Sequence, residues 1–171
     1  MVLELKVPEG GHIETLRPLI PKFISYIISF VYVGLYWNNH HHLFHAIKKI
    51  NGRILWANLF LLFSLSLLPF SSGWMGENHF GNTPVGIYGV NLIFCAIAFF
   101  ILELEAIKYE GKDSTIAAAL KFKTKEITST FLYIIGIVLS FFVPIASIMC
   151  YTIVALLWLI PDTRIEKILN K

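Results

Sequence analysis

The sequence predicts an all-α integral membrane protein, a bundle of five transmembrane helices in a single membrane domain over residues 1–171. Composition gives the first reason: 56% of the 171 residues are hydrophobic and 15% are charged, and the mean hydropathy is +0.68, unlike a soluble domain. The second reason is that the chain divides into apolar segments suited to cross a hydrocarbon core about 30 Å thick. The predicted spans are residues 16–46, 54–70, 85–105, 127–143 and 145–160.

The first predicted span carries two rows of side chains that recur at alternating steps of three and four residues, as positions on one helical face do. The largely aromatic row consists of Phe23, Tyr26, Phe30, Val33, Trp37, His40 and Phe44. The polar row consists of Ser25, Ser29, Tyr32, Tyr36 and Asn39. Hydroxyl and amide groups without hydrogen-bond partners are costly in lipid, so we expect the polar row to be buried between helices.

The second predicted span, residues 54–70, follows a short turn and should run antiparallel to the first. Asn58 then lies at about the depth of three side chains on the first span, Trp37, His40 and His41. We expect these residues to share hydrogen bonds, each of which contributes on the order of 1 kcal/mol in a membrane.

The third predicted span, residues 85–105, follows a segment that we expect to be a loop. Residues 72–82 are rich in glycine, serine and asparagine, which are typical of turns. Thr83 is the expected cap of the third span and Pro84 its first helical residue. In the last apolar region, Pro144 separates two shorter spans, which predicts a tight helical hairpin.

Positive charges predict the orientation of the chain. Lysine and arginine gather at residues 48–53 and 108–125 and again after the last span, whereas residues 71–84 contain neither. Because cytoplasmic loops are enriched in these residues, the carboxyl terminus is expected in the cytoplasm. Five spans then place Met1 outside, so we interpret residues 1–15 as the remnant of an additional first helix followed by an extracytoplasmic loop. A short surface extension is the alternative.

Several of these residues together resemble a known family, the transmembrane protein 175 family of potassium channels in its prokaryotic, single-repeat form. The matching residues are Phe23, Tyr26, Ser29, Phe30, Trp37, Asn39, His40, His41, Leu43, Phe44, Leu55, Trp56, Asn58, Pro69, Phe70, Tyr88, Gly89, Pro144, Pro161 and Asp162. The resemblance implies a multi-pass protein of the cell membrane, with one six-helix repeat per subunit and four subunits around a pore for potassium ions. Membrane lipid is the other expected partner, and nucleic acid is not.

One part of the family pattern is absent from this sequence. The family's first helix lines the pore and carries an arginine followed closely by Phe-Ser-Asp, and the sequence has no such motif. Only the tail of that helix, with Val2, Leu3 and Leu5, is expected to remain. We therefore expect that the chain as written lacks the first of six helices and does not build a normal pore.

The resemblance also implies roles for the polar and aromatic cluster. In the family such a cluster braces the first helix, so its residues are expected to support the pore rather than to bind ions. They are Ser29, Phe30, Trp37, Asn39, His40, His41 and Asn58. No cofactor and no enzymatic activity are expected.

Two other functions remain open. A chain that keeps the family's helices but has lost its pore would be a non-conducting membrane scaffold. Alternatively, His41 and His45 lie one helical turn apart, which is ligand spacing for zinc or haem. No acidic residue or cysteine stands beside this cluster in the sequence, so the metal-binding or haem-binding interpretation ranks below the channel.

Overall fold

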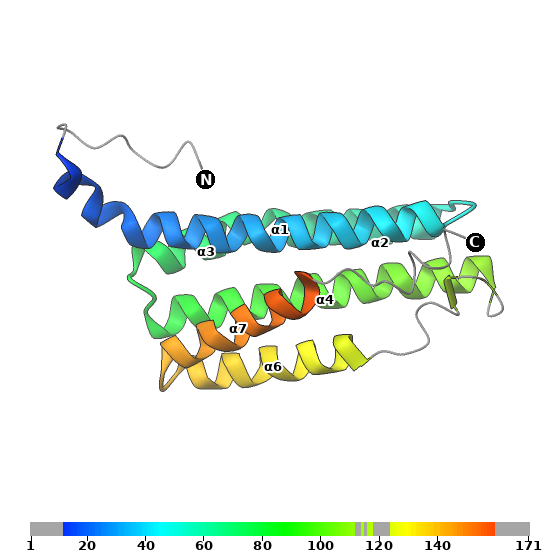
Figure 1. Cartoon of the computed structure of the whole chain (residues 1–171). Coiled ribbons are helices and arrows are strands. Elements are labelled where there is room, and N and C mark those ends of the chain that lie inside the picture. Colours follow the sequence, from blue (N-terminus) through cyan, green and yellow to red (C-terminus); the bar gives the residue numbers. More distant parts are fainter. Residues whose placement is uncertain (1–11, 112–113, 115, 118–123, 160–171) are drawn as a thin grey trace.

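The computed structural model describes residues 12–111, 114, 116, 117 and 124–159 (Figure 1). Its elements are helices: η2 (Ile13–Leu19), α1 (Ile20–Ala46), α2 (Gly52–Ser66), α3 (Leu68–Glu77), α4 (Asn82–Glu110), α6 (Thr124–Ser140) and α7 (Pro144–Leu159). The all-α prediction is confirmed for these residues. Three continuous stretches, Ile13–Ala46, Gly52–Glu77 and Asn82–Glu110, are long and apolar enough to cross a membrane.

The count of five spans stays a prediction. Helices α6 and α7 contain 17 and 16 residues, which corresponds to roughly 24–26 Å at 1.5 Å per residue. The predicted hairpin between them is confirmed, because a turn at residues 141–143 separates α6 from α7 and Pro144 begins α7.

The two rows on α1 face opposite environments within the described chain. Ser25, Ser29 and Tyr32 of the polar row are buried, which confirms the expectation that this face packs between helices. Phe23 and Phe30 of the aromatic row are exposed, and the rings of Phe23, Tyr26 and Phe30 follow one another at centroid distances of 6.4 Å. The part of the aromatic row with Phe23, Phe30 and Trp37 therefore lies on the outside of the bundle, whereas Tyr26, His40 and Phe44 are partly buried.

The loop predicted at residues 71–84 is wrong for its first half, because helix α3 continues to Glu77. The second predicted span is accordingly two helices with a break at Leu67, whose N–H donates to the Ser64 oxygen at 3.3 Å in a tightened turn. Pro69, which has no N–H to donate, lies in the first turn of α3. Ser72, Gly73 and Gly76, interpreted from the sequence as turn formers, are small residues inside α3, whereas residues 78–81 form the turn before α4.

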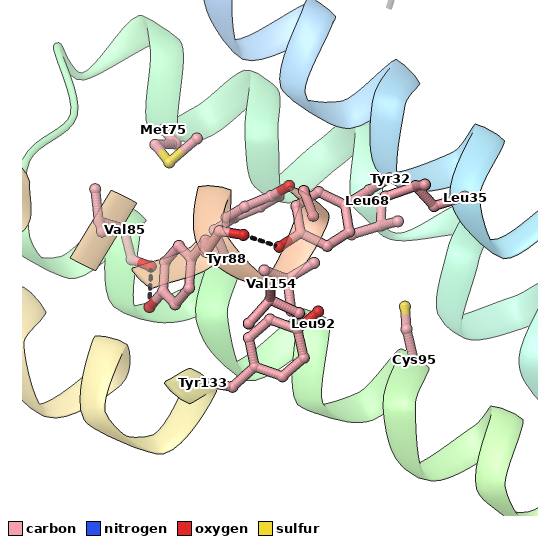
Figure 2. Close-up of a cluster of buried hydrophobic side chains, with 12 residues drawn as sticks. Tyr32, Leu35, Leu68, Met75, Val85, Tyr88, Leu92, Cys95, Tyr133 and Val154 are labelled. Atoms are coloured by element: carbon pink, nitrogen blue, oxygen red, sulfur yellow. Dashed lines mark hydrogen bonds between the residues drawn. The ribbon is translucent and has the colours of Figure 1, made fainter. Parts of the chain in front are cut away.

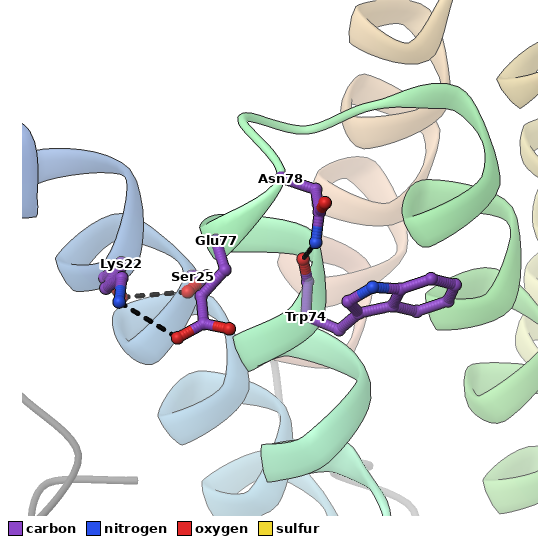
Figure 3. A network of polar contacts seen from close by, with 5 residues as sticks. All are labelled: Lys22, Ser25, Trp74, Glu77 and Asn78. Carbon is purple, nitrogen blue, oxygen red and sulfur yellow. Dashed lines mark hydrogen bonds and ion pairs between the residues drawn. The ribbon is translucent and has the colours of Figure 1, made fainter.

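These small residues let α3 approach α1 closely, which explains why they occur in a helix. At Gly76 a Cβ atom would lie 2.9 Å from the Ser25 Cβ and 3.0 Å from the Pro21 oxygen. Close backbone approach over small residues is a common way for membrane helices to associate. Beside this contact, Lys22 Nζ donates to Glu77 Oε1 at 2.9 Å, as Figure 3 shows.

Helix α4 is the central helix of the bundle. It contacts α2, α3, α6 and α7 and is longer at both ends than the predicted span. Gly81, rather than the predicted Thr83, is its N-cap, and Gly111 ends it with a φ of 98°, a value that favours glycine. The amide of Asn82 donates to the Phe141 oxygen at 3.0 Å, so the start of α4 lies beside the end of α6 and the two helices are antiparallel.

Tyrosines from α1, α4, α6 and α7 meet in the larger of two buried clusters (Figure 2). The Tyr32 hydroxyl donates to the Tyr151 carbonyl oxygen at 2.6 Å, and the Tyr151 hydroxyl donates to the Val85 oxygen at 3.4 Å. The ring of Tyr88 contacts both tyrosines edge-on, with centroid distances of 6.2 Å and 5.9 Å. This cluster joins the α6–α7 hairpin to the rest of the bundle.

Candidate functional site

The candidate site lies where the last turns of α1 pass the first turns of α2. Nε2 of His40 lies 2.7 Å from Oδ1 of Asn58 and forms a hydrogen bond between the two helices. An amide oxygen only accepts, so the imidazole is the donor. The ring of His40 also contacts Phe44 at a centroid distance of 4.4 Å. The prediction that Asn58 bonds to the histidine group is confirmed for His40.

A ladder of stacked rings occupies the outer side of the same segment. Trp37 stacks on His41 with centroids 5.6 Å apart and planes 17° apart, and His41 stacks on His45 at 6.3 Å and 21°. Trp37 is 65% exposed, and His41 and His45 are exposed as well. The ladder is therefore on the surface of the described bundle, preorganised by helical spacing, and not part of its core.

The structure divides the predicted cluster between two faces. Phe30 lies outside with Trp37 and His41, whereas Ser29 is 2% exposed and lies in the interior. The amide of Asn39 donates to the Leu35 oxygen of its own helix at 2.8 Å. The expectation of one hydrogen-bond network shared by Asn58, Trp37, His40 and His41 is therefore too broad, because the described bond joins only His40 and Asn58. The roles of these residues in supporting a pore remain predictions.

The metal-binding alternative rests on His41 and His45 alone. Within residues 12–111 and 124–159 and the few described positions between them, no group of three or more histidine, cysteine or acidic side chains is placed to hold a metal ion. The two rings stack on each other on the exposed side of α1. The residues predicted to remain from a first helix, Val2, Leu3 and Leu5, lie outside the described residues.

Sequence reasoning missed several buried polar groups within the bundle. The Asn91 amide on α4 donates to the Ser71 hydroxyl at 3.0 Å, and Trp158 Nε1 on α7 donates to the Ser129 hydroxyl at 2.8 Å. Glu103 is 4% exposed inside α4. The signal was present in the sequence, because a polar residue inside an apolar helix requires a buried partner.

The His40–Asn58 bond leads to a first testable prediction. We expect Asn58→Leu to lower the free energy of unfolding by about 1 kcal/mol, and this effect to vanish in a His40→Phe background. A double-mutant cycle in detergent, followed by thermal unfolding, measures the coupling. Asn39→Leu is the control, because the Asn39 amide bonds within its own helix and its effect should be equal in both backgrounds. Equal effects of Asn58→Leu in the two backgrounds would contradict the assignment.

Comparison with known proteins connects this site to potassium channels. A family model described as endosomal/lysosomal potassium channel TMEM175 matches residues 1–69, which include the whole candidate site. A protein of Chryseobacterium sp. strain P1-3 that is named a potassium channel is 55% identical over 171 residues, covering 100% of this chain and 89% of the relative. Another protein named a potassium channel, from Streptomyces collinus, is 24% identical over 107 residues, covering 58% of this chain and 52% of the relative.

The fold has a counterpart among solved structures. The crystal structure of a lysosomal potassium-selective channel TMEM175 homolog from Chamaesiphon minutus matches with a TM-score of 0.79. The match covers 94% of this chain and 87% of the other, at 22% sequence identity. At this identity the likeness shows the fold alone.

Proposed function

We propose that this chain is a subunit of a tetrameric channel permeable to potassium ions. The premise is that the chain belongs to the TMEM175 family of potassium channels. The observation that carries this proposal is the 55% identity, over the full 171 residues, with a protein named a potassium channel. Such channels are transport proteins and not enzymes. The fold shared with the homolog from Chamaesiphon minutus agrees with membership of this family.

The outer face of α1 supports assembly into a tetramer. Phe23, Phe30 and Trp37 are large, exposed and aligned on one side of the helix. Aromatic side chains of this kind are enriched in protein interfaces, and the ladder of Trp37 and His41 offers a flat surface to another helix. In our proposal this face meets a pore helix or a neighbouring subunit, and the His40–Asn58 bond holds α1 in register with α2 behind it. These residues support the pore and do not bind ions.

The proposed location is the cell membrane, with the carboxyl terminus in the cytoplasm and lipid around the bundle. The backbone N–H groups of Lys48 and Lys49 donate to Glu110 Oε1 at 2.9 Å and 3.1 Å. The loop after α1 therefore lies beside the end of α4, so two regions rich in positive charge are at one end of the bundle. Clustering of cations at one end supports a cytoplasmic assignment for that end.

Potassium flux tests the proposal. The 171-residue chain and the whole Chryseobacterium relative are reconstituted separately into liposomes, and uptake of rubidium, a potassium analogue, is measured against a sodium gradient. We expect potassium-selective uptake from the relative. A relative that is inactive under all conditions, or that does not prefer potassium over sodium, would contradict the channel proposal for both proteins.

The same experiment tests the expectation about the first helix. We propose that residues 1–171 tested alone take up less rubidium than the whole relative, because the match covers 89% of the relative. Equal uptake by the two proteins would show that this expectation is wrong while supporting the channel proposal. Uptake by the relative alone would support the expectation.

A further inference from the structure

We infer that a cavity within the bundle binds a small organic cation, an ammonium group carried on an apolar body. The cavity has a volume of about 550 Å³ and is lined by side chains of α1, α4 and α6, with Trp158 from α7. Binding pockets for small molecules usually have volumes of about 300–1,000 Å³. The cavity is separate from the His40–Asn58 pair, so this inference does not depend on ion conduction.

The cavity has a polar end and an apolar end. Its lining runs from Tyr32 to Asn39 on α1, from Ala96 to Glu103 on α4 and from Glu126 to Ile134 on α6. Helices α1 and α4 run in the same direction and α6 runs in the opposite one, as Figure 1 shows. Asn39, Glu103 and Glu126 therefore gather at one end. At 1.5 Å per residue each stretch covers roughly 10–12 Å, the length of a phenylalkylamine.

Charge at the polar end favours a cationic ligand. Oε2 of Glu126, which lines the cavity, is buried with no hydrogen-bond partner among the described residues. A buried carboxylate oxygen is costly unless a cation or a hydrogen-bond donor meets it. An ammonium group supplies both the positive charge and up to three donors. A neutral or anionic ligand of the same shape supplies no positive charge.

The walls of the cavity suit the rest of such a ligand. Aromatic rings from each of the contributing helices line it, among them Tyr36, Phe99, Phe131 and Trp158. Ring faces attract cations within about 6 Å of the centroid, and the protein already places one cation in this way: Lys125 Nζ is 5.9 Å from the Trp158 centroid. Lys125 is not among the described residues that line the cavity. The walls therefore accept an aromatic or alkyl body and tolerate a charged head.

The test compares two probes of equal shape and different charge, 4-phenylbutylamine and 4-phenylbutanol. Trp37, Trp56 and Trp74 are replaced by phenylalanine in the full chain, which leaves Trp158 as the remaining one of four tryptophans, and its fluorescence reports binding in detergent. We expect the amine to bind at least about tenfold more tightly than the alcohol. Glu126→Gln should remove this preference.

Glu105→Gln is the matched control, because Glu105 also lies on α4 but contacts Lys108 Nζ at 3.6 Å and is not among the described lining residues. It should leave the preference for the amine unchanged. Equal binding of amine and alcohol, or an unchanged preference in Glu126→Gln, would overturn the inference. A lack of any fluorescence change with either probe would also overturn it, because the cavity would then be filled by another part of the protein.

Discussion

Replacing Gly89 with leucine is expected to lower the free energy of unfolding by about 3 kcal/mol or more, the upper range for overpacked cores. A Cβ atom at this position would collide with the Tyr151 side chain and would lie 2.8 Å from the Ile137 Cγ1. The Tyr151 ring has little freedom to withdraw, because it is buried and its hydroxyl donates to the Val85 oxygen. The substitution should therefore separate the α6–α7 hairpin from α4.

Gly34→Leu provides the control for this prediction. Gly34 lies within helix α1, where a Cβ atom would meet nothing within 4 Å. Both substitutions gain helix propensity of a similar size, roughly 0.8 kcal/mol or less, so the difference between them isolates the packing against Tyr151. Thermal unfolding in detergent gives the two midpoints. A Gly89→Leu midpoint equal to that of Gly34→Leu would show that the close contact of α4 with the hairpin is wrong.

Replacing Trp37 with alanine is expected to dissociate the proposed tetramer. Trp37 is mostly exposed, and its ring contact among the described residues is the stacking on His41, so the fold should remain intact. Truncation of a tryptophan at the centre of an interface commonly costs 2 kcal/mol or more, roughly a 30-fold weaker association. Light scattering of the protein in detergent, over a range of concentrations, measures the mass of the assembly.

Phe142→Ala is the matched control for the assembly experiment. Phe142 is 75% exposed and lies in the turn between α6 and α7, whereas Trp37 lies on α1. This variant should assemble as the unmodified chain does. If Trp37→Ala showed the same dependence of mass on concentration as the unmodified chain, the role assigned to the α1 face would be wrong. If the unmodified chain were monomeric at every concentration, the tetramer itself would be excluded.

The periodicity of α1 shows what a sequence pattern can predict about the faces of a helix. The spacing of Ser25, Ser29 and Tyr32 predicts a shared face, and the cost of unpaired hydroxyls in lipid predicts that this face is buried; both predictions are confirmed. The antiparallel return of α2 after a short turn predicts that Asn58 reaches the histidine group, and the bond to His40 confirms it. In each case local geometry and the lack of water in lipid were sufficient.

Helix α3 shows where such reasoning fails. Serine and glycine at residues 71–76 are typical of turns in water-soluble proteins, and the sequence alone predicts a loop there. In the structure these small residues form a helix that packs against α1, with Gly76 in contact with Ser25. These small residues allow α3 to pack closely against a neighbouring helix. The sequence pattern alone does not identify which helix that is.

The sequence by itself determined the class of protein, most of the helices with their approximate limits, the family, and the shared depth of Asn58 and the histidine group. Only the tertiary structure decided that Trp37 and His41 face outward while Ser29 faces the core, and that Glu103 and Glu126 meet in one cavity. The physical reason is that helical periodicity fixes which residues share a face. What that face meets depends on segments distant in the chain, which approach only when the bundle packs.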